Sequence, residues 1–78
     1  MIGMILKNMR LSNGLSQKDL GKLLNLADTT ISSYERENSN PDFETIIKIS
    51  KICNYEIIFK DKNNNLISVE EMSKEKDY

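Results

Sequence analysis

Apolar residues recur every three or four positions along most of this chain, a spacing that places them on one face of an α-helix. The first segment of this kind spans residues 2–13. Its apolar face holds Ile2, Leu6, Met9 and either Ile5 or Asn13. The pair Asn13-Gly14 follows, and Gly14 can adopt the left-handed conformation that commonly closes a helix. The pattern therefore predicts a helix that ends at this pair.

A second, shorter helix is predicted over residues 17–24. Ser16 suits the N-cap position, and Asp19 three residues later approximates a capping box with a short acid. The positions that face inward are Leu20, Leu23 and Leu24. We expect the chain to turn directly after this helix.

A third helix is predicted over residues 28–37, after a turn at residues 25–27. Ile31 and Tyr34 are spaced to face the core. Asp28 is favourable at the start, because the N-terminus of a helix is its positive end. The second and third helices are thus joined by a tight turn.

A fourth helix begins at Pro41-Asp42, with Asp42 as its N-cap, and ends at Asn54. One stripe contains Phe43, Ile46, Ile49 and Cys53. Ile47 and Ile52 are apolar as well, so this helix carries more apolar surface than one buried face requires.

The pattern then changes to one that is typical of strands. Residues 55–60 are rich in β-branched and aromatic side chains, and alternation places Tyr55, Ile57 and Phe59 on one side. Residues 61–65 are turn-like, and residues 66–69 favour a returning strand. Two arrangements remain open: a local hairpin, or pairing with the same strand of a second subunit. A capping-box pattern also favours a short helix over residues 69–76.

These elements predict an all-α domain of four to five helices with a short C-terminal β-strand or hairpin. A chain of 78 residues has room for one domain. We expect a helical domain at residues 1–54, a strand or hairpin for dimerisation at residues 55–69, and a flexible acidic tail at residues 70–78.

The composition argues against most catalytic and metal chemistry. The chain has no histidine and a single cysteine, Cys53, which we interpret as a buried thiol. Histidine is the commonest general base and a common metal ligand, and a structural zinc site needs a full set of Cys and His ligands. We therefore expect no enzyme activity, no metal and no cofactor.

The charge distribution gives little support for binding to nucleic acid. The formal net charge is −1; residues 1–60 carry eight Lys/Arg and seven Asp/Glu, whereas residues 61–78 carry three and five. A basic patch, the usual signature of a DNA-binding domain, is therefore weak. No apolar run approaches the roughly 18 residues of a membrane-spanning helix. We expect a cytoplasmic protein without a membrane partner.

The outer surface of the third helix is polar and small. It carries Asp28, Thr29, Thr30 and Ser33. A threonine can offer its methyl group to thymine and its hydroxyl to a base edge, and an aspartate can accept a hydrogen bond from cytosine. These residues therefore suit a helix in the major groove, although a solvated polar helix face has the same composition.

Several residues stand at spacings that together are quite specific. In chain order they are Met9-Arg10, Gly14-Leu15-Ser16-Gln17, Asp19-Leu20, Leu23-Leu24, Ile31-Ser32, Tyr34-Glu35-Arg36, Pro41, Ile46 and Ile49. With them, residues 2–54 resemble the lambda-repressor/Cro-type helix-turn-helix family, also called the xenobiotic-response-element family. The resemblance implies a sequence-specific DNA-binding transcriptional regulator, a repressor that binds a pseudo-palindromic operator as a dimer.

The resemblance also implies roles for single residues. The positions that reach base edges are matched by Asp28, Thr29, Thr30 and Ser33. The expected contacts to the DNA backbone are Gln17, Lys18, Arg36, Asn38 and Asn40. Arg10 and Glu35 match a partly buried ion pair that ties the first helix to the end of the third.

Two residues depart from the family pattern. Gly21 stands where the family prefers alanine; it permits close helix approach but costs about 1 kcal/mol of helix propensity. Glu37 stands where a glycine often follows the recognition helix, and with Asp28 it makes this surface less basic. We therefore expect DNA contacts through hydroxyl, amide and backbone donors more than through a basic patch.

The apolar surplus near the C-terminal end has two explanations. We assign it to a homodimer interface formed by Ile47, Ile52, Ile57, Ile58 and Phe59; alternatively, these residues complete the core of one subunit. Antitoxins of the HipB type look similar in this part. The alternative function is accordingly an interaction module whose tail masks a toxin, with autoregulatory DNA binding.

Overall fold

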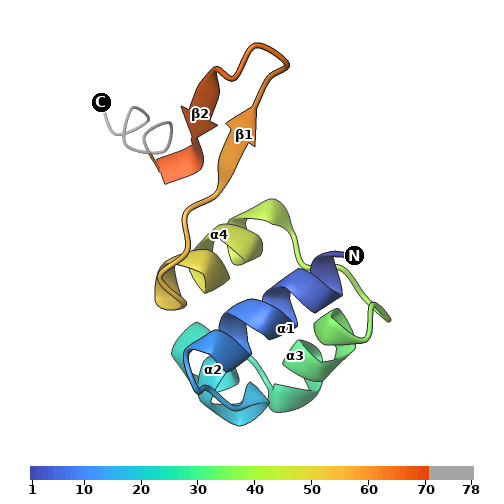
Figure 1. Cartoon of the computed structure of the whole chain (residues 1–78). Helices are drawn as coiled ribbons and strands as arrows, with labels where there is room; N and C mark the ends of the chain where they lie inside the picture. The colour runs from blue at the N-terminus through green and yellow to red at the C-terminus, as the bar shows by residue number, and fades with distance from the viewer. Residues whose placement is uncertain (71–78) are drawn as a thin grey trace, which may run out of the picture.

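Four α-helices followed by a two-stranded β-hairpin make up residues 1–70, the part that the computed structural model describes (Figure 1). The elements are α1 (Ile2–Ser12), α2 (Gln17–Leu24), α3 (Asp28–Glu35), α4 (Phe43–Ile52), β1 (Ile58–Lys60) and β2 (Leu66–Ser68). The predicted fold class is thus confirmed. The tail predicted at residues 70–78 and the helix predicted at residues 69–76 lie almost entirely outside the described residues.

Local caps and left-handed residues mark several of the helix ends. Gly14 has a φ of +67° directly after α1, as its place in the sequence predicts. The N-cap Asp42 accepts a hydrogen bond from the backbone N–H of Thr45 at 2.8 Å. α3 ends at Glu35, two residues before the predicted end. Glu37 has a φ of +61°, which no helix can continue.

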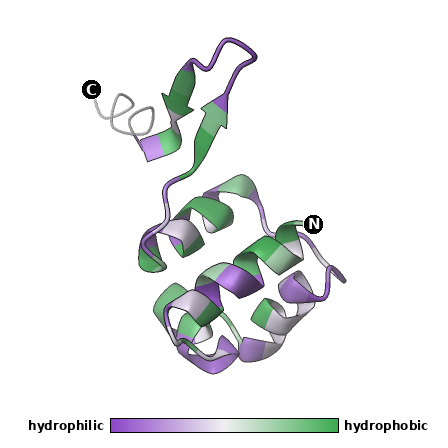
Figure 2. Cartoon of the chain, viewed as in Figure 1, coloured by the Kyte–Doolittle hydropathy of each residue, from purple (hydrophilic) through white to green (hydrophobic). Residues whose placement is uncertain are grey.

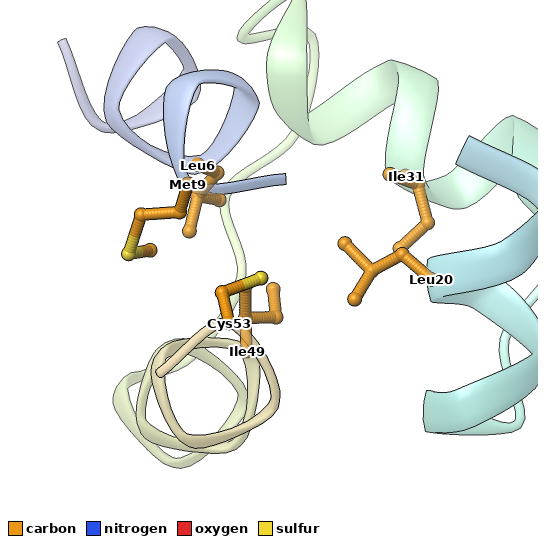
Figure 3. Packing of buried hydrophobic residues seen from close by; sticks show 6 residues of the cluster. All are labelled: Leu6, Met9, Leu20, Ile31, Ile49 and Cys53. Atoms are coloured by element: carbon orange, nitrogen blue, oxygen red, sulfur yellow. The ribbon is translucent and has the colours of Figure 1, made fainter. Parts of the chain in front are cut away.

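The core is a single cluster to which all four helices contribute, together with the residue that caps α4 (Figure 3). Its buried members are Leu6, Met9, Leu20, Ile31, Ile49 and Cys53. Figure 3 shows Leu6 and Met9 of α1 above Ile49, with Leu20 and Ile31 on the opposite side. Cys53 is buried, as interpreted from the sequence, and this burial raises the pKa of its thiol.

Two residues predicted to face inward are exposed instead. Leu23 is 60% exposed, because its neighbours Leu20 and Leu24 are the pair on the core face of α2. Phe43 is 49% exposed, because it is the first residue of α4 and lies beyond the buried cluster. Its ring lies 6.5 Å from that of Phe59, so it packs against the hairpin.

The strands pair within the chain. β1 and β2 are antiparallel with the register Ile58↔Ser68, Phe59↔Ile67 and Lys60↔Leu66. Of the two arrangements left open by the sequence, the structure has the local hairpin. The hairpin extends away from the helices (Figure 1), and its strands are largely hydrophobic (Figure 2).

Other parts of the backbone lie very close to two glycines. A Cβ on Gly3 would lie 2.6 Å from the backbone oxygens of Tyr34 and Glu35, so α1 begins directly against the end of α3. A Cβ on Gly21 would lie 2.6 Å from the backbone oxygen of Leu26.

Within residues 1–70, no helix is long and apolar enough to cross a membrane.

Candidate nucleic-acid interface

The start of α2 is held by a reciprocal pair of hydrogen bonds. The backbone N–H of Asp19 donates to the Ser16 hydroxyl at 2.9 Å, and the backbone N–H of Ser16 donates to the Asp19 carboxylate at 3.0 Å. This is the capping box that the sequence predicts. The hydrogen bonds from Ser16 also lower the pKa of Asp19. α2 therefore presents a well-defined N-terminus, the end of a helix that attracts anions.

The turn between α2 and α3 is compact. Asn25 has a φ of +59°, and the backbone N–H of Leu26 donates to the oxygen of Gly21 at 2.8 Å. This turn lies so close to Gly21 that a side chain there would meet its backbone. Gly21, which stands where the family prefers alanine, thus permits the turn to lie close to α2.

α3 presents the small polar side chains predicted for it. Asp28 and Thr29 are exposed, whereas Thr30 and Ser33 are half-buried. Ile31 is 2% exposed and anchors the opposite side of the helix in the core. No large apolar side chain interrupts the outer face, so a base edge could approach the hydroxyl and carboxylate groups directly.

Ser33 is engaged in a contact that the sequence did not predict. Its hydroxyl lies 2.8 Å from the hydroxyl of Ser39, and its backbone oxygen accepts from the N–H of Asn38 at 2.9 Å. The chain can return to Ser33 because Glu37 has a left-handed conformation. The segment after α3 is therefore tied to the outer face of α3.

This segment, residues 36–40, carries three of the predicted contacts to the DNA backbone. Arg36, Asn38 and Asn40 are all exposed. The carboxylate of Glu37 is directed away from them, toward the start of α1, where it accepts from the backbone N–H of Gly3 at 3.4 Å. The negative charge of Glu37, which was expected to make the DNA-facing surface less basic, therefore lies beside the start of α1.

The predicted ion pair between Arg10 and Glu35 is present and buried. Arg10 donates through Nε to Glu35 Oε2 at 2.6 Å and through Nη2 to Oε1 at 2.9 Å. Arg10 Nη1 also donates to the backbone oxygen of Leu15 at 2.8 Å. The two side chains are 8% and 3% exposed. The pair joins α1, the loop before α2 and the last residue of α3.

Gln17 belongs to the same network. Its amide Nε2 donates to Glu35 Oε1 at 3.0 Å, which links the first residue of α2 to the ion pair. Burial disfavours the charged form of Glu35, but the hydrogen bonds from Arg10 and Gln17 outweigh it and lower the pKa of this carboxyl. Gln17 is half-buried and keeps a second amide N–H for another acceptor.

The predicted residues therefore form three groups around α3. Asp28 and Thr29 lie at its start; Ser33 joins the segment 36–40 at its far end; Gln17 and the exposed Lys18 begin α2. Lys18 and Arg36 form no salt bridge within residues 1–70, so both cations remain available to an anion.

Ser39 is the residue of this surface that the sequence did not reveal. It stands between two asparagines in a segment without periodicity, and its contact depends on the path of the chain after Glu37. One signal was available in the sequence. A glycine often occupies the position of Glu37 in the family, and this indicates a left-handed residue that redirects the chain.

Comparisons with known proteins agree with this geometry. The family model described as "Helix-turn-helix" matches residues 6–59. The chain is 36% identical over 53 residues to the HTH-type transcriptional regulator ImmR of Bacillus subtilis (strain 168). The match covers 68% of this chain and 42% of that relative, so the chain spans less than half of the relative's length. No solved structure matches. The chain belongs to the Cro/C1-type helix-turn-helix family.

Proposed function

We propose that this chain is a DNA-binding transcriptional regulator that reads base edges with α3 and represses transcription as a homodimer. The observation that carries the proposal is the outer face of α3: small polar side chains on a helix that Ile31 anchors in the core and Glu35 ties to α1. The similarity to a transcriptional regulator supports the same function.

The proposed division of labour follows the chemistry of each group. Asp28, Thr29, Thr30 and Ser33 supply acceptors, hydroxyls and methyl groups for base edges. Contacts to phosphates come from Gln17, Lys18, Arg36, Asn38 and Asn40. Only two of these five are cations, so we expect weak affinity for random DNA and a shallow dependence on salt.

A dimer would match the symmetry of a pseudo-palindromic operator. The chain has principal extents of 38 × 30 × 23 Å, so two copies side by side would place their α3 helices tens of ångströms apart. Half-sites one helical turn apart require roughly 34–36 Å between recognition helices. Repression would follow because a bound dimer blocks the access of RNA polymerase to the promoter.

The decisive experiment is the selection of binding sites from random duplex DNA at a stated salt concentration. We expect an enriched sequence with two-fold symmetry. Thr29→Ala should relax the preference at one position of each half-site and leave the fold intact. Thr45→Ala on α4 is the matched control and should leave the preference unchanged. Failure to enrich any sequence, with the protein folded, would refute the proposed function.

A further inference from the structure

An apolar groove lies between α1, α4 and β1, on a part of the molecule that the proposed DNA contacts do not use. Its volume is about 450 Å³. Apolar side chains from these elements and from the residues just before β1 line it, among them Ile2, Ile5, Met9, Phe43, Ile57 and Phe59. The only ionisable carboxyl or amino group in the lining is that of Glu56. A groove of this composition suits an apolar occupant and not a phosphate or a sugar.

The hairpin beside the groove exposes apolar side chains on both faces. Side chains on one face of an antiparallel pair alternate with those on the other, so Phe59 and Ile67 share the face turned toward Phe43. Ile58 and Leu66 lie on the other face, opposite Ser68 and Lys60 respectively, and are 46% and 62% exposed. A two-stranded hairpin is at best marginally stable in water by itself, so a partner surface on this second face would add to the support that Phe43 gives to the first.

The C-terminal tail does not suit the groove. Residues 71–78 contain Met72 and Tyr78, and most of the others are charged. A segment of this kind would place several charges against apolar walls, which is unfavourable without compensating partners.

We propose that the occupant is a second copy of the chain: in each copy, the hairpin face that carries Ile58 and Leu66 lies in the apolar groove of the other copy. The contact is reciprocal, because each copy supplies one hairpin and one groove, as a two-fold dimer requires. This inference rests on the dimer of the proposed function and specifies its surface. The proposed interface leaves out Ile52, which the sequence prediction included, because Ile52 packs against the core of its own subunit.

The exposed apolar area is of the size that a stable dimer needs. Seven large side chains of the groove rim and hairpin are between 43% and 62% exposed: Ile5, Phe43, Tyr55, Ile58, Phe59, Leu66 and Ile67. A fully exposed residue of this size has roughly 200 Å² of accessible surface. About half of that area is exposed in each of the seven, which gives roughly 700 Å² per copy. A standard interface buries about 800 Å² per partner.

Cysteine cross-linking between two different copies tests the arrangement. One copy carries Ile5→Cys in the groove; the other, labelled with ¹⁵N, carries Leu66→Cys on the hairpin. The native Cys53 is buried and remains in both. Under mild oxidation we expect a disulfide-linked product whose mass identifies one copy of each kind. Leu11→Cys replaces Ile5→Cys in the control, because Leu11 is 54% exposed on α1 but does not line the groove.

Sedimentation of a charge variant provides the second measurement. Leu66→Lys should convert the dimer to a monomer without lowering the melting temperature of the subunit, because Leu66 lies outside the core. Leu23→Lys is the control, since Leu23 is 60% exposed on α2.

The outcomes separate this inference from the function on which it rests. Mixed cross-links together with a monomeric Leu66→Lys variant support it. A wild-type dimer that neither cross-links nor responds to Leu66→Lys overturns the groove contact and leaves the homodimer standing. A wild-type monomer at micromolar concentration overturns both, whereas binding to selected DNA is measured separately and tests only the role of α3.

Discussion

Replacing Glu35 by alanine should destabilise the fold strongly, because it leaves a buried arginine without its anion. Arg10 and Glu35 have side chains that are 8% and 3% exposed, and two hydrogen bonds of 2.6 and 2.9 Å join them. The substitution also removes the acceptor of Gln17. Breaking a buried pair by removing one partner costs roughly 3–5 kcal/mol. A domain of 78 residues has about 4–12 kcal/mol of stability in total, so the loss is severe.

Urea denaturation at pH 7, followed by circular dichroism, measures this loss. Arg10→Met, Glu35→Ala and the double variant complete a thermodynamic cycle. We expect the double variant to be more stable than the sum of the two single losses predicts, because it leaves no unpaired charge. Glu44→Ala, an exposed acid on α4, is the control and should change stability by at most about 0.5 kcal/mol. A loss below about 1 kcal/mol for Glu35→Ala would refute the reasoning.

The pH dependence gives an independent measure of the same contact. The pKa of Glu35 is lower in the folded chain than in the unfolded chain. Its contribution is therefore fully present above the unfolded pKa of about 4.3 and is lost as the pH falls through the lower folded pKa. The difference in stability between the wild type and Glu35→Gln should accordingly shrink below about pH 4.

Three further predictions concern other parts of the chain. Gly21→Ala should lower the melting temperature, because a Cβ 2.6 Å from the backbone of Leu26 outweighs a gain of about 1 kcal/mol in helix propensity; a higher melting temperature would contradict this. Asp42→Ala should lower the stability at pH 7 and lower it less in acid, because hydrogen bonds from Thr45 to this N-cap lower the pKa of its carboxyl; denaturation at several pH values measures the difference. Arg36→Ala should weaken binding to all DNA sequences alike and reduce the salt slope by about 1, as fluorescence anisotropy can determine; Lys62→Ala in the hairpin turn should not.

The helices were predictable because their signals are local. Ser16 and Asp42 each accept a hydrogen bond from a residue three positions later, so their roles follow from the sequence alone. The hairpin turn is similarly local: the Asp61 carboxylate accepts from the backbone N–H groups of Asn63 and Asn65. Such contacts depend on few residues and not on the rest of the fold.

The predictions from sequence fail where the burial or contact of a residue depends on how separate elements pack together. Apolar spacing placed Leu23 and Phe43 inward, but a core built from four short helices covers only part of the apolar surface. Such a chain retains exposed apolar residues, and the pattern does not distinguish them from core residues. The contact of Ser33 with Ser39 likewise depends on the path of the chain after α3, which helical periodicity does not specify.

The resemblance predicted the ion pair but not the engagement of Gln17, and this residue connects stability with the proposed binding of DNA. One amide N–H of Gln17 donates to Glu35, and the other is free to meet a phosphate at the positive end of α2. Glu35 would then position the amide for DNA while it neutralises Arg10. Two variants test this link: Glu35→Gln replaces the carboxylate acceptor of Gln17 with a neutral amide oxygen and so weakens that hydrogen bond, whereas Gln17→Ala removes the amide and leaves the ion pair in place.

We therefore expect both variants to bind an operator more weakly at a temperature at which circular dichroism reports each fully folded. The double variant should bind no more weakly than Gln17→Ala, because Glu35 affects the phosphate contact only through Gln17. If folded Glu35→Gln binds like the wild type while Gln17→Ala does not, the amide is positioned without the ion pair. If the two losses add, Glu35 influences DNA binding by another route.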